Sequence, residues 1–175
     1  MHDTYLAGWI NIVVTNQSGI SRGFSTWKDY EKISIEMINR LGNQAIIHGI
    51  YANSEFPKNN VKNDWRKPSP NMILEATKEF NINLKNSFLI GDRLTDLLAA
   101  KNAGINKLVH VLTGHGKNER DKVLKNLKLS YEKKELILIN QISDLSFNDF
   151  LTYTKWSCYI LKIAFKYKSK PLVGW

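Results

Sequence analysis

Short runs of hydrophobic residues alternate with amphipathic stretches along the chain. The apolar runs predict strands at residues 12–14, 45–51, 87–90, 107–112 and 135–139. Apolar positions repeated every three or four residues predict helices at residues 26–41, 70–80, 95–103 and 118–127. Residues 1–11 are too short to supply a full element before the first strand. Alternation of strands and helices predicts an α/β fold, a three-layer Rossmann-like parallel sheet with helices on both faces.

The ends of these helices have recognisable signals. Thr26, followed three residues later by Asp29, forms a weak capping box. Ser69 and Pro70 suit the N-cap and the first position of the second helix. Gly104 is placed to end the third. In the first helix one apolar face, which we expect to join the core, consists of Trp27, Tyr30, Ile33, Met37 and Leu41.

The last part of the chain differs in composition. Over residues 151–167 an apolar side follows helical spacing, and lysines lie on another side. The apolar positions are Tyr153, Trp156, Ile160, Ile163 and Tyr167. We therefore divide the chain into a domain of residues 1–150 and a basic amphipathic C-terminal extension of residues 151–175. Two interpretations stay open: a helix docked on the domain, or a helix that binds a membrane surface or a protein partner.

Composition narrows the class of protein. With 43% hydrophobic and 23% charged residues, the chain has the make-up of an ordinary folded domain. It has no apolar run of about 18 residues, the minimum for a membrane-spanning helix. The start, Met-His-Asp-Thr, shows neither the basic nor the apolar region of a secretory signal. The single cysteine, Cys158, excludes an internal disulfide and a cysteine-cluster metal site. These features predict a cytoplasmic location.

The net charge of +9 raises the possibility of nucleic-acid binding. Five lysines and no acidic residue lie in residues 151–175, so this segment carries more than half of the excess charge. The sequence has no helix-turn-helix, zinc-finger or RNA-binding signature. We therefore expect no nucleic-acid partner.

Polar side chains follow the first strand directly, in the order Thr15, Asn16, Gln17 and Ser18. In open α/β sheets, ligands bind at the carboxyl ends of the strands. Hydroxyl, amide and backbone N–H donors without acidic neighbours suit an anion, phosphate above all. A simple turn after the strand is the alternative interpretation.

Two further segments carry candidate chemistry. Arg66 and Lys67 precede a helix N-terminus and suit an anion there, although they fit solvated surface cations too. Asp92 follows the strand at 87–90 and suits Mg²⁺, which binds one or two carboxylates together with substrate oxygens. We interpret Asp96 as a helix N-terminal charge and His115 as a loop residue rather than a base.

Three motifs together carry a family resemblance. They are Thr15-Asn16-Gln17-Ser18-Gly19-Ile20, Arg66-Lys67-Pro68 and Gly91-Asp92-Arg93-Leu94-Thr95-Asp96. In this order and spacing they resemble the D-glycero-D-manno-heptose 1,7-bisphosphate phosphatases. These enzymes belong, with the histidinol-phosphatases, to the haloacid dehalogenase-like superfamily. The resemblance covers residues 8–145; the first two motifs are typical of this branch, and the third is common to the superfamily.

The resemblance implies a Mg²⁺-dependent hydrolase that removes a phosphoryl group from a small sugar bisphosphate through an aspartyl-phosphate. It implies that Thr15 and Asn16 bind the transferring phosphoryl group and that Gln17 and Ser18 line the substrate. It implies substrate recognition by Arg66, charge stabilisation by Lys67 and Mg²⁺ binding by Asp92. Arg93 occupies a position that is often lysine.

One departure concerns the nucleophile. The family's Asp-x-Asp pair lies on a first strand well before the Thr-Asn-Gln loop, but only 14 residues precede Thr15. Asp3 has no second aspartate two residues on and falls in the helix that leads into the strand. We therefore expect this chain to lack the nucleophile and the central strand between those ending at Thr15 and Asp92.

The missing central strand leaves two strand edges unpaired, and unsatisfied buried backbone groups cost about 1–3 kcal/mol each. Three explanations stay open: a misplaced start, a rearrangement that closes the gap, or a decayed remnant. An alternative function is a non-catalytic protein that binds a sugar phosphate or a partner on this fold.

The second departure concerns zinc. Many relatives bind a structural zinc just before the Arg-Lys-Pro motif. The positions that align with those ligands hold Asn53, Glu55, Asn63 and Trp65. None of these residues is a thiolate, so we expect no zinc.

Overall fold

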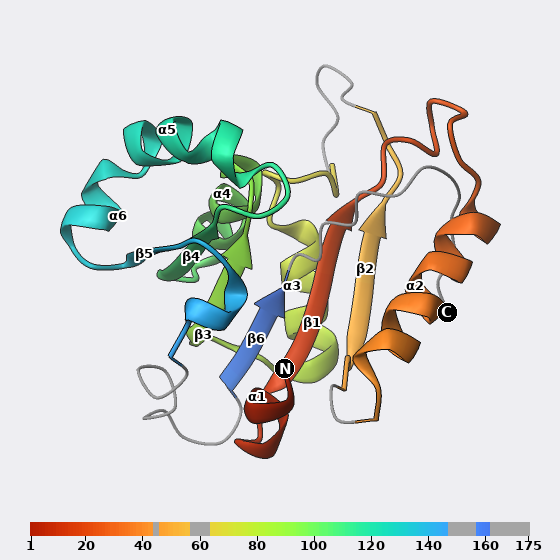
Figure 1. Ribbon diagram of the computed structural model, residues 1–175, viewed down its shortest axis with the longest axis horizontal. Coiled ribbons are helices and arrows are strands. Elements are labelled where there is room, and N and C mark those ends of the chain that lie inside the picture. Colours follow the sequence, from red (N-terminus) through yellow and green to blue (C-terminus); the bar gives the residue numbers. More distant parts are fainter. Residues whose placement is uncertain (44–45, 57–63, 147–156, 162–175) are drawn as a thin grey trace.

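The computed structural model describes residues 1–43, 46–56, 64–146 and 157–161. Its described strands form one six-stranded sheet in the order β2-β1-β6-β3-β4-β5 (Figure 1). Every neighbouring pair is parallel, so all carboxyl ends lie at one edge. The strands are β1 (Ile10–Asn16), β2 (Gly49–Asn53), β3 (Asn83–Gly91), β4 (Lys107–Val111), β5 (Leu136–Ile139) and β6 (Ser157–Leu161).

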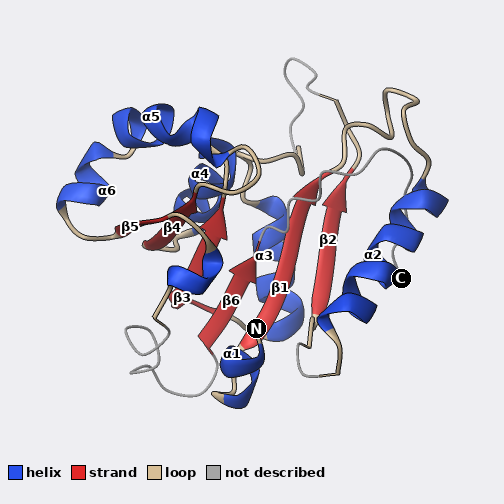
Figure 2. Cartoon of the chain, viewed as in Figure 1, coloured by secondary structure: helices blue, strands red, loops and turns tan. Residues whose placement is uncertain are grey.

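Helices connect most of these strands (Figure 2). They are α1 (His2–Leu6), α2 (Trp27–Leu41), α3 (Asn71–Phe80), α4 (Leu94–Ala103), α5 (Gly116–Asn126), α6 (Lys128–Glu132) and the short 3-10 helix η1 (Ile142–Asp144). The α/β class and the parallel sheet are thus confirmed. Residues 1–11 hold α1, the helix expected around Asp3, and the start of β1, so the expectation that they supply no full element is wrong. Helix α6 was not predicted.

The core lies on both faces of the sheet because neighbouring residues of a strand point to opposite sides. Leu89 of β3 belongs to a large cluster that also includes Ile73 of α3 and Leu97 of α4. Its neighbours Phe88 and Ile90 belong to a second, smaller cluster. Helices α3, α4 and α5 contribute to the first cluster, whereas the second is completed by residues beside α1 and η1. Of the longer described helices, α3, α4 and α5 therefore pack in the larger cluster, whereas α2 contributes no residue to either.

Helix α2 joins the core less than its pattern predicts. Met37 is its single buried residue, and Trp27 and Tyr30 are half-buried with their rings edge to face, 5.9 Å between centroids. Thr26 donates its hydroxyl hydrogen to Asp29 rather than capping a backbone N–H. Since α2 lies at the β2 edge of the sheet in Figure 1, only part of its surface meets the rest of the domain.

The centre of the sheet is filled by β6, drawn in blue between β1 and β3 in Figure 1. Its backbone pairs with both neighbours; Ile160 lies opposite Ile12 of β1 and opposite Leu89 of β3. The prediction of an amphipathic helix over residues 151–167 is therefore wrong for residues 157–161. Residues 151–156 and 162–175 lie outside the described residues.

The physical reason is the demand for backbone partners. A gap between β1 and β3 leaves rows of N–H and C=O groups that a parallel strand satisfies on both sides at once. A helix satisfies only its own backbone groups and leaves both edges open. In the given sequence β6 therefore closes the gap, whereas a misplaced start and a decayed remnant both stay predictions.

None of the described helices combines the length and the hydropathy that crossing a bilayer requires. The cytoplasmic location stays a prediction. A membrane or protein partner for residues 151–175 also stays a prediction.

Candidate active site

The carboxyl end of β1 carries the first group of candidate residues. Thr15 is buried, and Asn16 is the last residue of the strand, so both belong to the strand rather than to a turn. Gln17 donates its side-chain N–H to Thr15 Oγ1 at 2.9 Å and its backbone N–H to the carbonyl of Asn53 at 2.6 Å. Ser18 accepts hydrogen bonds through its backbone carbonyl, from the side chains of Ser21 and Arg22. The loop is therefore fixed to the ends of β1 and β2.

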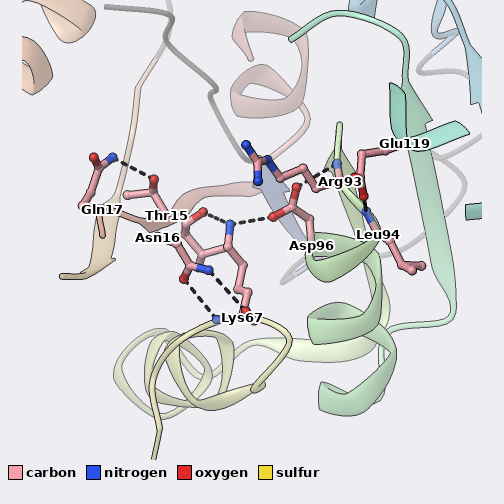
Figure 3. A network of polar contacts seen from close by, with 9 residues as sticks. Thr15, Asn16, Gln17, Lys67, Arg93, Leu94, Asp96 and Glu119 are labelled. Carbon is pink, nitrogen blue, oxygen red and sulfur yellow. Dashed lines mark hydrogen bonds and ion pairs between the residues drawn. The ribbon is translucent and has the colours of Figure 1, made fainter. Parts of the chain in front are cut away.

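Asn16 joins the Arg-Lys-Pro segment to β1. Its Oδ1 accepts the backbone N–H of Lys67 at 3.0 Å, and its Nδ2 donates to the carbonyl of Lys67 at 3.2 Å (Figure 3). Two hydrogen bonds between one side chain and one backbone unit fix both the position and the orientation of that unit. The structure thus brings together Asn16 and Lys67, which are 51 residues apart in the sequence.

The ammonium group of Lys67 lies between β1 and the start of α4. Its Nζ donates to the carbonyl of Val14 at 2.7 Å and lies 2.8 Å from Asp96 Oδ1 (Figure 3). Both side chains of this ion pair are about 1% exposed. A buried lysine without a counter-charge would be costly, and Asp96 supplies that charge.

Asp96 has a second contact that confirms its predicted place at a helix N-terminus. Its Oδ2 accepts the backbone N–H of Arg93, the N-cap residue of α4, at 3.1 Å. The ion pair with Lys67 was not predicted. A Cβ atom at Gly91 would lie 2.6 Å from Asp96 Cβ, so the glycine lets Asp96 approach the end of β3. In the sequence, Gly91 directly before Asp92 is the feature that could have indicated close packing between the end of β3 and the start of α4.

Asp92 follows β3 and is buried at the same edge of the sheet. Its Oδ2 accepts the backbone N–H of His115 at 2.8 Å. His115 thus acts through its backbone, and its exposed side chain agrees with the prediction of a loop residue. One strand, β6, separates β3 from β1, so the ends of β1 and β3 are about 10 Å apart by ordinary strand spacing.

A histidine and an arginine that the sequence analysis missed lie next to Asp92. His110 of β4 is fully buried, with Nε2 3.2 Å from the carbonyl oxygen of Asp92 and Nδ1 2.9 Å from Arg120 Nε. Burial lowers the pKa of His110, and the positive charge of Arg120 lowers it further. Both effects favour the neutral imidazole.

Positive charge gathers on the loops around the site. Arg66 donates through Nη1 to the carbonyl of Glu55 at 3.1 Å. Burial lowers the pKa of Arg66; Asp64 opposes this effect, whereas the charges of Arg93 and Arg22 add to it. The charges of Arg93 and Arg22 thus both act on Arg66, an arrangement that an anion would stabilise.

The single carboxylate of Asp92 suits Mg²⁺ better than a structural metal ion, which protein side chains bind on all sides. Among residues 1–43, 46–56, 64–146 and 157–161, no three His, Cys, Asp or Glu side chains gather as a metal-binding group. A site with one buried carboxylate leaves most positions to water and phosphate oxygens, as Mg²⁺ prefers. The absence of zinc stays a prediction, because residues 57–63 lie outside the described ranges.

Comparison with known proteins shows which family this chain is similar to. Residues 64–140 match the model of the HAD-hydrolase-like family. The D-glycero-beta-D-manno-heptose-1,7-bisphosphate 7-phosphatase of Haemophilus ducreyi is 33% identical over 144 residues, which are 79% of this chain and 74% of the relative. The enzyme of the same name from Helicobacter pylori strain J99 is 40% identical over 106 residues, covering 58% of this chain and 59% of the relative.

A solved structure is also similar. It is the D,D-heptose 1,7-bisphosphate phosphatase from B. bronchiseptica complexed with magnesium and phosphate, with a TM-score of 0.63 and 27% identity. The match covers 69% of this chain and 66% of that one. Several of the curated relatives are spanned only in part, by as little as 55% of their length.

The parallel sheet with polar residues and an aspartate at its carboxyl edge is that of a haloacid dehalogenase-like hydrolase. Within this class the chain belongs to the D-glycero-D-manno-heptose 1,7-bisphosphate 7-phosphatase family, whose members are phosphomonoesterases.

Proposed function

We propose that this protein binds a sugar bisphosphate of the D-glycero-D-manno-heptose 1,7-bisphosphate type and hydrolyses one of its phosphomonoesters with Mg²⁺. The observation that carries the proposal is the bonded assembly of Asn16, Lys67 and Asp96 at the edge where Asp92 ends β3. This assembly fixes a cation and a carboxylate beside polar strand ends. Such an arrangement suits a phosphoryl group and a divalent metal.

Lys67 stabilises the phosphoryl group. Its Nζ is held by Val14 and Asp96 at 2.7 and 2.8 Å, so its position is set before a ligand arrives. A positioned ammonium group neutralises charge on the equatorial oxygens without reorganisation. Thr15 and Asn16 add a hydroxyl and an amide group at the carboxyl end of β1.

Asp92 is the residue that would hold Mg²⁺. When bound, the ion supplies positive charge to the phosphoryl oxygens and orients them. The part played by the chain is to fix the carboxylate, which His115 does through its backbone N–H at 2.8 Å.

Arg66 recognises the rest of the substrate. The positive charges of Arg22 and Arg93, which come from two other loops, act on its guanidinium group. Planar guanidinium groups bind phosphate through paired hydrogen bonds, which lysine cannot do. A second phosphate on the substrate would offset the repulsion that Arg22 and Arg93 exert on Arg66, which supports a bisphosphate over a monophosphate. Gln17 and Ser18, on the loop after β1, would line the sugar.

Binding without turnover is the second candidate function. The sequence contains no two aspartates separated by one residue, and the central strand β6 holds no carboxylate. The family resemblance implies that the nucleophilic aspartate lies on the central strand. On this alternative the chain uses the same contacts to hold a sugar phosphate.

A paired experiment on the whole chain distinguishes the candidates. Calorimetry measures binding of heptose 1,7-bisphosphate in the presence of Mg²⁺, and a colorimetric assay measures release of orthophosphate. We expect Arg66→Gln to weaken binding by about tenfold or more, as loss of a charged hydrogen bond does. Arg40→Gln, on the exposed face of α2, is the matched control and should bind like the natural chain.

Release of orthophosphate that Asp92→Asn abolishes would support the hydrolase. Binding without release would support the second candidate. Absence of binding in the natural chain would contradict both.

A further inference from the structure

A network of four hydrogen bonds links Asp92 to β4, to α5 and to the end of β5; Asp92 itself takes part in two of them. Asp92 accepts at its side chain from the His115 backbone and at its carbonyl from the His110 ring. His110 in turn accepts from Arg120 of α5, whose Nη2 donates to the carbonyl of Ile139 at 2.9 Å. Asp92 is therefore held at two points, by β4 and by the turn before α5.

The chemistry of arginine decides which ring nitrogen of His110 carries the proton. A guanidinium group has donors and no acceptor. Since Arg120 Nε lies 2.9 Å from His110 Nδ1, that nitrogen is the acceptor and carries no proton. The proton is then on Nε2, which donates to the carbonyl of Asp92 at 3.2 Å.

The turn between β4 and α5 is equally fixed. Gly116 packs so closely on β4 that a Cβ atom there would lie 1.9 Å from the carbonyl oxygen of Val111. The preceding residue, His115, thereby presents its N–H to Asp92 Oδ2. Backbone and side chain of Asp92 are thus oriented by the same β4–α5 unit.

We propose that Arg120 and His110 are positioning residues: Arg120 sets the tautomer of His110, and His110 fixes the backbone of Asp92 so that its carboxylate is oriented for a divalent cation. The proposal rests on the proposed function, which assigns the cation to Asp92. The proposal assigns neither residue a contact with the cation; both act through Asp92. Groups that orient a metal ligand in this way typically change metal affinity by about 10- to 100-fold when they are replaced.

The test uses the whole chain with Mn²⁺ as a spectroscopic substitute for Mg²⁺, together with orthophosphate. Arg120→Met removes the donor to His110 and keeps much of the side-chain length. Lys125→Met is the matched control, because Lys125 is an exposed cation on the same helix. Electron paramagnetic resonance gives the Mn²⁺ dissociation constant, and nitrogen-15 NMR gives the tautomer of His110.

We expect the natural chain and Lys125→Met to show a proton on Nε2 and the same Mn²⁺ affinity. Arg120→Met should show a mixture of tautomers and bind Mn²⁺ about tenfold more weakly. Arg120→Lys, which restores a donor but not the planar fork, should recover part of the loss. Circular dichroism of each variant shows whether the fold is kept.

Two outcomes would overturn the proposal, and they are distinguishable. If folded Arg120→Met binds Mn²⁺ as tightly as Lys125→Met, the positioning role is wrong and the proposed function stands. If the natural chain itself binds no Mn²⁺, the assignment of the cation to Asp92 fails, and the positioning role fails with it. Should Arg120→Met not fold, folded His110→Gln serves as the second variant, and Mn²⁺ affinity equal to that of Lys125→Met would likewise contradict the proposal.

Discussion

Residues 64–140 and the C-terminal strand β6 follow their sequence patterns to different degrees. In the first region, α3, β3, α4, β4, α5 and β5 form within a few residues of where periodicity places them. In the second, the spacing of apolar residues is helical, yet residues 157–161 form a strand. The difference shows that the spacing of apolar residues does not decide the local structure by itself. Where the rest of the sheet offers unpaired strand edges, pairing of the backbone overrides that spacing.

Both patterns are present around β6. Ile160 fits a helical stripe with Trp156 and Ile163, but residues 158–161 are also an uninterrupted apolar run. A short apolar run is compatible with a fully buried strand. Two open edges at β1 and β3 favour the strand, because it satisfies backbone groups that a helix leaves unpaired.

The largest expected effect is on the closure of the sheet by β6. A chain shortened to residues 1–156 loses β6, whereas a chain of residues 1–161 keeps it. Several buried groups left unpaired, at about 1–3 kcal/mol each, approach the whole stability of a domain of about 5–15 kcal/mol. We therefore expect thermal unfolding followed by circular dichroism to be cooperative for residues 1–161 and absent or non-cooperative for residues 1–156. Equal transitions for both chains would show that β6 does not close the sheet.

The next effect concerns the buried ion pair of Lys67 and Asp96, which lies within residues 64–140. Lys67→Met leaves the Asp96 carboxylate without its counter-charge in a buried place, which costs about 3–5 kcal/mol. The double variant Lys67→Met with Asp96→Asn removes both charges and should recover part of that loss. Urea denaturation of the natural chain, both single variants and the double variant gives the coupling free energy. Additive losses would mean that the two charges do not interact.

A smaller effect is expected at Gly91. In Gly91→Ala the new methyl group meets Asp96 Cβ at 2.6 Å, so β3 and α4 must move apart. Overpacking of this kind costs about 1–3 kcal/mol. Ala99→Gly in α4 is a contrasting control, because it removes a methyl group from the same buried helix and adds no contact. Urea denaturation should show a loss for Gly91→Ala together with a weaker Lys67–Asp96 coupling; unchanged coupling would separate Gly91 from the ion pair.

The smallest effect concerns His48, which lies outside the candidate site. Its titration should make the free energy of unfolding depend on pH. Burial lowers the pKa of His48, and its Nδ1 accepts the backbone N–H of Asn11 at 3.0 Å. The folded state thus prefers the neutral ring, so its stabilisation is complete above the unfolded pKa of about 6.5 and is lost as the pH falls through the lower folded value. Because the ring is partly exposed, we expect a loss of about 0.5 kcal/mol or less, measured as the difference between the natural chain and His48→Gln from pH 7.5 to 5. Parallel pH profiles would contradict this assignment.

The sequence predicts the parts of the site that depend on strand ends and helix starts. Thr15 and Asp92 lie at the carboxyl ends of β1 and β3, and Asp96 lies in the first turn of α4, as expected. Such placements follow from local patterns and from the parallel sheet, so they can be read along the chain.

Pairs that form only by packing could not be predicted in this way. The contact of Lys67 with Asp96 depends on the bonds of Asn16 to Lys67 and on the close approach that Gly91 allows. The contact of His110 with Arg120 depends on how α5 packs on β4, which no spacing between the two residues reveals. The central place of β6 likewise depends on the edges of β1 and β3.

The central claim is that Thr15, Lys67 and Asp92 surround one phosphate site that depends on a divalent cation. Calorimetric titration of orthophosphate into the whole chain, with and without Mg²⁺, tests it most directly. We predict phosphate binding that Mg²⁺ strengthens, with an equal effect of phosphate on Mg²⁺ affinity, as linkage requires. Asp92→Asn should abolish this coupling while the fold is kept. Phosphate affinity that is the same with and without Mg²⁺ in the natural chain would contradict the claim.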